Sequence, residues 1–180
     1  MSPDEARQLL ANAELIVCQE DVQAAVRRVA FAVTEALSNS NPLVLGVMSG
    51  ATIFAGHLLP QLRFPLDYDY LHVTRYGDAI SGGKLSWVVE PRIAVAGRTV
   101  LLVDDILDEG ITLAAIRDRL LRQGATRCLT AVFSDKATGK PKPIAPDFVG
   151  ITLPNRYVFG FGMDVKGAWR NLPAVYALKE

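Results

Sequence analysis

The chain has 180 residues, and its 19 Lys and Arg residues balance 19 Asp and Glu residues, so the formal net charge is zero. Apolar residues make up 50% and charged residues 21% of the sequence, which excludes an intrinsically disordered chain. The lack of a basic excess argues against a general nucleic-acid binder, and the lack of an apolar run of about 18 residues excludes a membrane-spanning helix.

The N-terminus and the cysteines favour a cytoplasmic chain. The first ten residues, MSPDEARQLL, lack the apolar core of a secretory signal peptide. Cys18 and Cys128 are far apart in the sequence, which argues against a disulfide framework or a cysteine zinc site. We expect two buried thiols in a reducing compartment.

Helices and strands are expected to alternate along most of the chain. Apolar residues at steps of three and four predict helices, and short apolar runs between turn formers predict buried strands. Because this alternation requires crossover connections, it indicates an α/β fold in which a parallel twisted sheet is flanked by helices. The expected helices cover residues 4–15, 21–37, 51–60 and 111–122, and the expected strands cover residues 42–48, 68–74, 99–105 and 127–133.

The C-terminal part of the chain differs in character. Residues 136–147 are rich in turn formers, and we expect them to begin a small C-terminal hood appended to the sheet. We expect one domain over residues 1–180, with a core over about 20–135 and a hood over about 136–180 that includes the N-terminal segment. Strand-like pieces of this hood are expected at residues 148–152, 156–161 and 174–178.

The strongest chemical signal is VLLVDDILDEGIT, residues 100–112, where a buried strand runs into acidic residues and then a helix. Ligands of parallel sheets collect where strand ends meet helix starts. Gly110 permits a tight turn, and the backbone N–H groups that follow, with the Thr112 hydroxyl, can bind a phosphate. The acidic residues beside this phosphate site are Asp104, Asp105, Asp108 and Glu109.

Other interpretations of this segment fit less well. An acidic helix N-terminus explains Asp108 and Glu109 but not the Asp104–Asp105 pair at the end of an apolar strand. A calcium loop needs an oxygen ligand where Leu107 stands, and the Gly-Lys-Ser/Thr ending of a P-loop is absent.

This segment resembles the signature of type I phosphoribosyltransferases, which bind phosphoribosyl pyrophosphate (PRPP), and the resemblance covers the chain from residue 42 onward. Residues 136–172 are similar to the base-binding hood of hypoxanthine-guanine phosphoribosyltransferases. The resemblance implies purine salvage, in which PRPP and hypoxanthine or guanine give IMP or GMP and pyrophosphate. It also implies Mg²⁺ as cofactor and a homo-oligomer, either a dimer or a tetramer.

The resemblance implies a role for each matching residue in PRPP binding. Asp108 would be the general base at the purine N7. The pyrophosphate would meet the turn at Met48, Ser49 and Gly50, where the family often has a cis peptide, and also Arg170. Asp104 and Asp105 would hold the ribose hydroxyls and, with Asp164, magnesium. The 5′-phosphate would be wrapped by Glu109, Gly110, Ile111 and Thr112.

The purine and the lid are assigned in the same way. Lys136 would donate to the 6-oxo group, Tyr157 would stack on the base and the Val158 backbone would bond its edge. We also expect the glycine-rich stretch at residues 76–84 to be a long functional loop. The residues that would open this mobile lid are Thr74, Arg75 and Tyr76.

Each role has a simpler alternative. Lys136 could be a surface lysine, Tyr157 could be a core aromatic, and Asp164 with Arg170 could form a surface ion pair. The sequence also departs from the family where Glu109 replaces Ser or Thr, and where Ser49 replaces a basic residue. Arg75 precedes Tyr76 where the lid commonly has Ser, and it could supply positive charge.

Two other functions remain open at this stage. An RNA-binding regulator of pyrimidine genes built on the same PRPP fold would need a basic surface, for which the arginines at 117, 119, 122 and 127 are the candidates. A salvage enzyme for adenine or xanthine stays within the enzyme class. Adenine carries a 6-amino donor, which a lysine donor at residue 136 opposes, whereas xanthine differs only at its 2-position.

Overall fold

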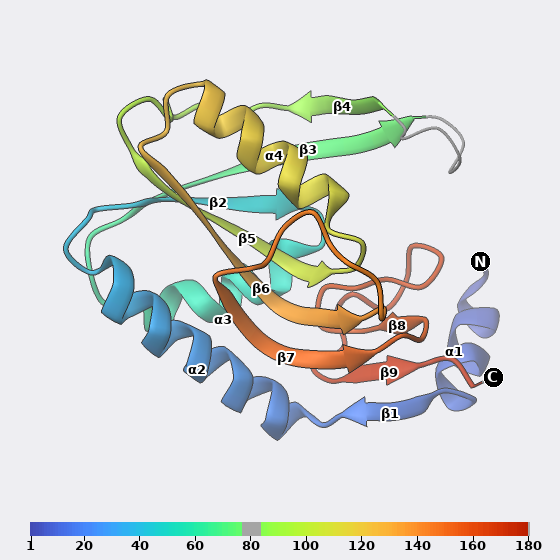
Figure 1. Ribbon diagram of the computed structural model, residues 1–180. Helices are drawn as coiled ribbons and strands as arrows, with labels where there is room; N and C mark the ends of the chain where they lie inside the picture. Colours follow the sequence, from blue (N-terminus) through green and yellow to red (C-terminus); the bar gives the residue numbers. More distant parts are fainter. Residues whose placement is uncertain (77–83, 180) are drawn as a thin grey trace.

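The computed structural model describes residues 1–76 and 84–179, and its centre is a six-stranded sheet (Figure 1). The strand order is β4-β3-β2-β5-β6-β7, and every neighbouring pair is parallel except β3 and β4. This confirms the expected parallel sheet. The strands are β2 (Leu43–Met48), β3 (Asp67–Tyr76), β4 (Lys84–Val89), β5 (Thr99–Leu107), β6 (Arg127–Ala137) and β7 (Phe148–Pro154).

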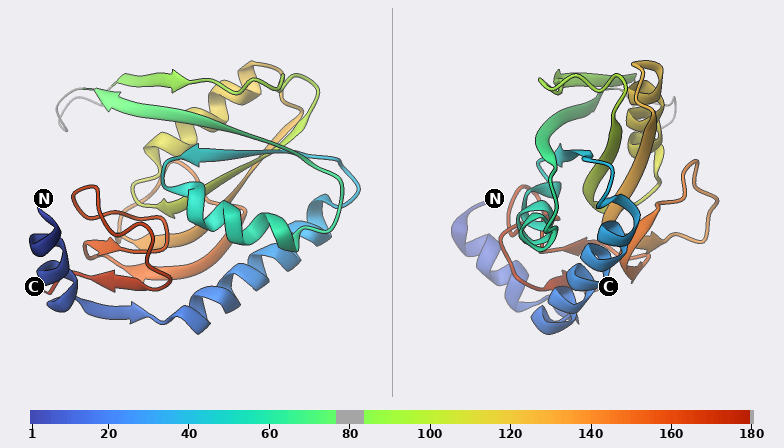
Figure 2. Two further views of the ribbon diagram at one scale, coloured as in Figure 1. Left: turned by 180° about the vertical axis from the view of Figure 1, so that it is seen from behind. Right: turned by 90° about the vertical axis from the view of Figure 1, so that its left-hand side faces the viewer.

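Helices cover both faces of this sheet, which explains why its central strands are apolar throughout. On one face, α2 and α3 pack against a core that includes Phe54 and Phe133 (Figure 2). On the other face, α4 contributes Leu113, Ile116 and Leu120 to a second core. The helices are α2 (Gln19–Leu37), α3 (Ala51–Leu58), which continues as a short 3₁₀ turn η1 (Leu59–Gln61), and α4 (Ile111–Arg122).

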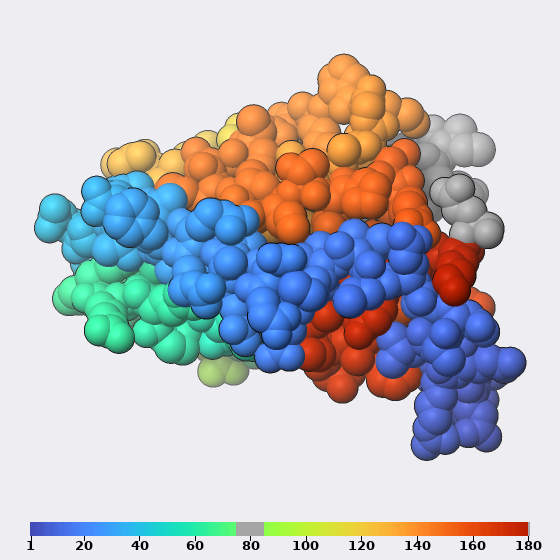
Figure 3. Space-filling view, turned by 90° about the horizontal axis from the view of Figure 1, so that it is seen from below, coloured from blue at the N-terminus to red at the C-terminus, as the bar shows by residue number. Residues whose placement is uncertain are grey.

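A second, three-stranded antiparallel sheet joins the two ends of the chain. Its order is β1-β9-β8, so the N-terminal strand lies beside the C-terminal one. Figure 3 shows the N-terminal segment against the C-terminal one, and Trp169 Nε1 donates to Ala6 O at 2.9 Å. This small sheet therefore combines N-terminal and C-terminal strands. The elements of this region are α1 (Pro3–Ala11), β1 (Glu14–Val17), β8 (Val158–Phe159) and β9 (Val175–Ala177).

The structure corrects several expected boundaries. The helix expected over residues 4–15 ends at Ala11, because residues 14–17 pair with β9 instead. Strand β4 is an element that the sequence patterns did not predict. The piece at 148–152 lies in β7 of the main sheet, and β6 continues to Ala137, so Lys136 lies on a strand.

Over residues 1–76 and 84–179, no helix is long and apolar enough to cross a membrane. The central part of the loop expected over 76–84 lies outside the described residues.

Candidate active site

Two adjoining cavities of about 400 and 390 Å³ open at the carboxyl ends of β2, β5 and β6. Both cavities are lined by Asp104 and Asp105 at the carboxyl end of β5 and by Asp108 just beyond it. Glu109 and Gly110 line the cavity of about 390 Å³. The cavities lie where a parallel sheet offers its strand ends, as predicted. The first is lined by Ser49, Gly50, Asp104, Asp105, Asp108, Thr112, Lys136, Tyr157, Val158, Asp164 and Arg170, among others.

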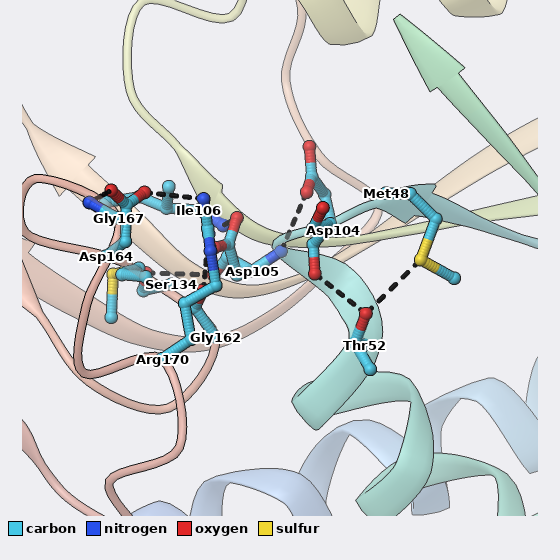
Figure 4. Close-up of polar contacts among 12 residues, drawn as sticks. Met48, Thr52, Asp104, Asp105, Ile106, Ser134, Gly162, Asp164, Gly167 and Arg170 are labelled. Carbon is cyan, nitrogen blue, oxygen red and sulfur yellow. Dashed lines mark hydrogen bonds and ion pairs between the residues drawn. The ribbon is translucent and has the colours of Figure 1, made fainter. Parts of the chain in front are cut away.

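The two adjacent carboxylates at the end of β5 are held by backbone N–H groups (Figure 4). Asp105 N donates to Asp104 Oδ1 at 2.9 Å, and Ile106 N donates to Asp105 Oδ1 at 2.8 Å. Burial and then the neighbouring Asp105 carboxylate raise the pKa of Asp104 well above its ordinary value. Burial also raises the pKa of Asp105, although the Asp104 hydrogen bond and Arg170 oppose it.

Two glycines make room for the Asp105 side chain. A Cβ atom on Gly50 would lie 2.5 Å from Asp105 Cγ and 2.6 Å from Asp105 Oδ1. A Cβ atom on Gly162 would lie 3.1 Å from Asp105 Cβ and 2.5 Å from Gly50 O. The carboxylate thus occupies space that exists because neither neighbour carries a side chain.

The turn from β5 into α4 has the form that the sequence predicts. Gly110 has a φ of 78° and precedes the first residue of α4, Ile111. Only glycine adopts this left-handed conformation at little cost. The first backbone N–H groups of α4 therefore face the cavity end of β5, as an anion site requires.

Lys136 and Asp108 meet across the ends of neighbouring strands. Lys136 Nζ lies 3.0 Å from Asp108 Oδ2, and the lysine side chain is 14% exposed whereas that of Asp108 is 51% exposed. Lys136 is therefore not a surface lysine. The pair places one hydrogen-bond donor and one proton acceptor side by side at the cavity.

Arg170 and Asp164 form a second ion pair, on the hood side of the cavity. Arg170 Nη2 lies 2.6 Å from Asp164 Oδ1, and Arg170 Nη1 donates to Gly162 O at 2.6 Å. The guanidinium also lies 3.9 Å from Asp105 Oδ2. The ion pair considered as an alternative thus exists, but it lies in the cavity beside the buried carboxylates (Figure 4).

The loop between β2 and α3 closes the other side of the cavity. The Met48–Ser49 peptide is cis, as the family resemblance implied. Thr52 Oγ1 donates to Ser49 O at 2.8 Å, so the first turn of α3 holds this loop. Ser49 and Gly50 directly precede α3, and this position places them at the cavity wall.

Tyr157 and Val158 lie at the edge of β8. The Tyr157 side chain is 53% exposed, so it is not a core aromatic, and Val158 is buried. Leu178 N donates to Tyr157 O at 3.0 Å, which ties this segment to the C-terminal strand. Tyr157 thus presents its ring at the mouth of the cavity.

Some residues predicted for the site lie elsewhere or remain undescribed. Ile111 is 48% exposed and lines a different cavity, so at the start of α4 it offers the predicted phosphate site only its backbone N–H group. Thr74 lies on β3 and does not line the two main cavities, and its Oγ1 is buried without a hydrogen-bond partner among the described residues. Arg75 and Tyr76 belong to β3 by their backbone, and the lid beyond them lies outside the described residues.

Sequence reasoning missed several residues around the site. Met163 and Val73 line the main cavity, and Ser134 Oγ donates to Asp105 O at 3.1 Å from a fully buried position. Lys142 also makes three hydrogen bonds near the strand ends. Ser134 and Lys142 give no local signal, because the contacts depend on the pairing of β5 with β6.

The oxygen donors of the site fit a hard divalent cation. In the described part of the chain, no group of three or more His, Cys, Asp or Glu side chains gathers as a ready metal site. Magnesium usually takes one or two carboxylates and completes its shell with substrate oxygens and water. The Asp104–Asp105 pair and Asp164, on opposite sides of one cavity, match that kind of shared site.

The chain is similar to known phosphoribosyltransferases over most of its length. The sequence pattern of the phosphoribosyl transferase domain family matches residues 16–166. A hypoxanthine-guanine phosphoribosyltransferase of Lactococcus lactis is 34% identical over 167 residues, which are 92% of this chain and 91% of that protein. The bifunctional protein TilS/HprT of Listeria innocua is 32% identical, and this chain spans 26% of its length.

A solved structure shows the same fold. The structure of a hypoxanthine-guanine-xanthine phosphoribosyltransferase aligns with a TM-score of 0.81 at 31% identity. The alignment covers 94% of this chain and 97% of that one.

Proposed function

Because this chain belongs to the phosphoribosyl transferase domain family, we propose that it transfers the phosphoribosyl group of PRPP to hypoxanthine or guanine, giving IMP or GMP and pyrophosphate. The observation that carries this proposal is the placement of Asp108 and Lys136, 3.0 Å apart, in the cavity that also contains the Asp104–Asp105 pair. Once this ion pair opens, the adjacent proton acceptor and donor suit the adjacent N7 and 6-oxo positions of a purine.

PRPP would occupy the end of β5 and the start of α4. Backbone N–H groups over residues 109–112 would bind the 5′-phosphate, aided by the positive end of the α4 dipole. The Glu109 carboxylate would have to point away from that phosphate. Asp104 and Asp105 would accept hydrogen bonds from the ribose hydroxyls, and the nearest cation, Arg170, lies 3.9 Å from Asp105 Oδ2.

The pyrophosphate would lie between the β2–α3 loop and Arg170. Ser49 and Gly50 offer backbone groups there, and Arg170 offers a guanidinium that now pairs with Asp164. Asp104, Asp105 and Asp164 would hold Mg²⁺ together with substrate oxygens. Bound magnesium would supply Lewis-acid neutralisation of the departing pyrophosphate.

The purine would lie between Tyr157 and the ends of β5 and β6. Tyr157 would stack on one face of the ring, and the Val158 backbone would bond its edge. Lys136 would leave Asp108 and donate to the 6-oxo oxygen. The hood boundary near residue 136 remains a prediction. Tyr157 is the residue through which the hood would contact the base.

The chemical step moves one proton and exchanges one bond at the ribose. Asp108 takes the proton from N7 as N9 forms its bond to C1′, and the bond from C1′ to the pyrophosphate oxygen breaks with its electron pair. A positioned general base of this kind typically contributes about 10²–10⁴-fold to the rate. Holding N9 in line with C1′ supplies a further large share.

The competing functions are less well supported. The relatives carry purine phosphoribosyltransferase names, which does not favour an RNA-binding regulator. Lys136 opposes adenine, because both would donate at the 6-position. Xanthine stays open, since one structural relative carries xanthine in its name. The unpaired thiols of Cys18 and Cys128 are consistent with the cytoplasm, and we expect a homo-oligomer there.

The decisive experiment is a panel of bases. Purified protein is incubated with PRPP and Mg²⁺ and with hypoxanthine, guanine, xanthine, adenine or uracil, and nucleotide formation is followed by chromatography. We expect IMP and GMP and little AMP or UMP. Formation of UMP alone would overturn the proposal in favour of the pyrimidine-linked regulator.

A further inference from the structure

Lys142 is a partly buried lysine whose ammonium group joins the ends of two strands. It lies in the segment between β6 and β7, and its side chain is 14% exposed. Its Nζ donates to Leu107 O at 2.8 Å, to Lys136 O at 2.7 Å and to Asp135 Oδ1 at 2.5 Å. An ammonium has three N–H donors, so three oxygen acceptors from β5 and β6 use all of them.

These acceptors lie next to the groups that would contact the purine. Leu107 immediately precedes Asp108 in the chain, and the carbonyl of Lys136 belongs to the donor residue itself. The last register pair between β5 and β6 is Leu107 with Asp135. Asp108 lies beyond that pair, so ladder hydrogen bonds no longer fix it to β6, and the Lys142 ammonium bridges the strands at this point.

The positive charge of Lys142 is balanced by an adjacent carboxylate. Asp135 neutralises the Lys142 ammonium, and the 2.5 Å contact is a charge-assisted hydrogen bond. Lys142 therefore neither needs nor competes for the Asp108 carboxylate, which pairs with Lys136. Lys136 thus lines the main cavity, whereas Lys142 lines two other cavities and bonds the strand ends.

We propose that Lys142 is a positioning residue, which fixes the backbone from which the Asp108 and Lys136 side chains extend and so matches the site to N7 and the 6-oxo group of a purine. The proposal rests on the proposed function. Lys142 acts through the backbone at Leu107 and Lys136. A shift of about 1 Å at a reacting group can cost about 10²-fold in rate, so a rigid tie at this point matters for purine use.

The test compares Lys142→Met with Lys140→Met. Both substitutions remove one positive charge from the same loop, but Lys140 is exposed and its side chain makes no hydrogen bond or ion pair recorded in the described structure. The steady-state kcat and KM for hypoxanthine are measured at saturating PRPP and Mg²⁺. The Kd of PRPP is measured by calorimetry, and thermal unfolding is followed by circular dichroism.

We expect Lys142→Met to lower kcat/KM for hypoxanthine by roughly 10- to 100-fold. The Kd of PRPP is expected to change by about twofold or less, because Lys142 donates no hydrogen bond to residues 109–112, where the 5′-phosphate would bind. Lys140→Met is expected to behave as the unsubstituted protein. Unchanged hypoxanthine kinetics in Lys142→Met, or equal losses in hypoxanthine and PRPP affinity, would overturn the proposal.

A second variant separates positioning from folding. Lys142→Cys is assayed before and after aminoethylation, which restores an ammonium at almost the reach of lysine, and the unsubstituted protein is treated in parallel because it contains Cys18 and Cys128. Recovery of kcat/KM for hypoxanthine in a variant that is already folded supports the proposal. A Lys142→Cys protein that is folded but does not recover kcat/KM after treatment would overturn the positioning role.

The outcome is also distinguishable from failure of the proposed function. If the unsubstituted protein and Lys140→Met do not convert hypoxanthine, the proposed function fails, and with it the basis of this inference. If both convert it and Lys142→Met does so equally well, the proposed function stands and the positioning role alone is wrong.

Discussion

Lys136 Nζ and Asp108 Oδ2 lie 3.0 Å apart although the two residues are 28 positions apart in the sequence and belong to neighbouring strand ends. In the protein without substrate, the residue proposed to select the 6-oxo group thus neutralises the proposed general base. A purine must separate the pair, and its own oxygen and N7 proton then replace the partner that each side chain loses. This exchange limits the cost of opening the pair.

Substitution of Asp108 by Asn tests the base. The amide keeps the shape of the side chain but cannot accept the N7 proton, so we expect kcat to fall by about 10²-fold or more. PRPP binding, measured by calorimetry, should remain. The exposed Asp118, substituted by Asn, is the control for loss of one acidic charge. A near-normal kcat in Asp108→Asn would remove this residue from the base role.

Substitution of Lys136 by Ala tests base selection. A hydrogen bond from a charged donor is worth about 1.5–3 kcal/mol, so kcat/KM for hypoxanthine should fall by roughly 10- to 100-fold relative to that for adenine. Asp108 also loses its ion-pair partner, and that effect is common to both substrates. The ratio of the two kcat/KM values is therefore the measurement, and an unchanged ratio contradicts the assignment.

The sequence predicted most of the main sheet because these strands are short apolar runs that can be recognised locally. The runs at β2 and β5 are apolar on both faces, and Gly110 marks the turn into α4. Strand β1 gave no such signal, because two of its four residues are exposed and it is held in place by pairing with β9 at the other end of the chain. Such long-range pairing cannot be inferred from a local pattern.

The site was predicted unevenly for the same reason. The acidic residues from Asp104 to Glu109 are contiguous and follow a buried strand, so their pattern is visible in the sequence. The ion pair of Lys136 with Asp108 and the three bonds of Lys142 depend on the register of β5 with β6. The resemblance gave Lys136 a role toward the purine 6-oxo group but did not predict its ion pair with Asp108, and nothing in the sequence singled out Lys142.

Substitution of Gly50 by Ala tests the space around Asp105. The new Cβ would lie 2.6 Å from Asp105 Oδ1, and the carboxylate must move, so we expect a loss of PRPP affinity of about 10-fold or more. Gly50 has a φ of −58°, which alanine adopts without strain, so the fold should persist. The measurements are PRPP titration by calorimetry and thermal unfolding.

Gly56→Ala is the matched control for this substitution. Gly56 lies within α3, and a Cβ there would meet no atom within 4 Å. Alanine in a helix interior is more favourable than glycine by about 0.5–1 kcal/mol, so this variant should be slightly more stable and bind PRPP normally. Equal PRPP affinities in the two variants would show that Asp105 has room to move.

Asp69 makes the stability of the fold depend on pH. Its carboxylate accepts from the backbone N–H groups of Tyr70 at 2.8 Å, Arg92 at 2.6 Å and Ile93 at 3.0 Å, and so ties β3 to the segment before β5. Burial acts to raise the pKa of Asp69, but these hydrogen bonds outweigh it and lower the pKa below its ordinary value. The carboxylate thus stabilises the folded state when ionised.

The sign of the effect follows from this lowered pKa. The contribution of Asp69 is fully present above the pKa of the unfolded chain, about 3.9, and is lost as the pH falls through the lower pKa of the folded protein. We expect Asp69→Asn to reduce the free energy of unfolding at pH 7 by about 1–3 kcal/mol. As the pH falls below about 4, the free energy of unfolding of this variant should decrease less steeply than that of the unsubstituted protein. Urea unfolding from pH 2.5 to pH 7, with Asp118→Asn as the exposed control, measures both. Parallel pH profiles for Asp69→Asn and the unsubstituted protein would assign the acid sensitivity to other carboxylates.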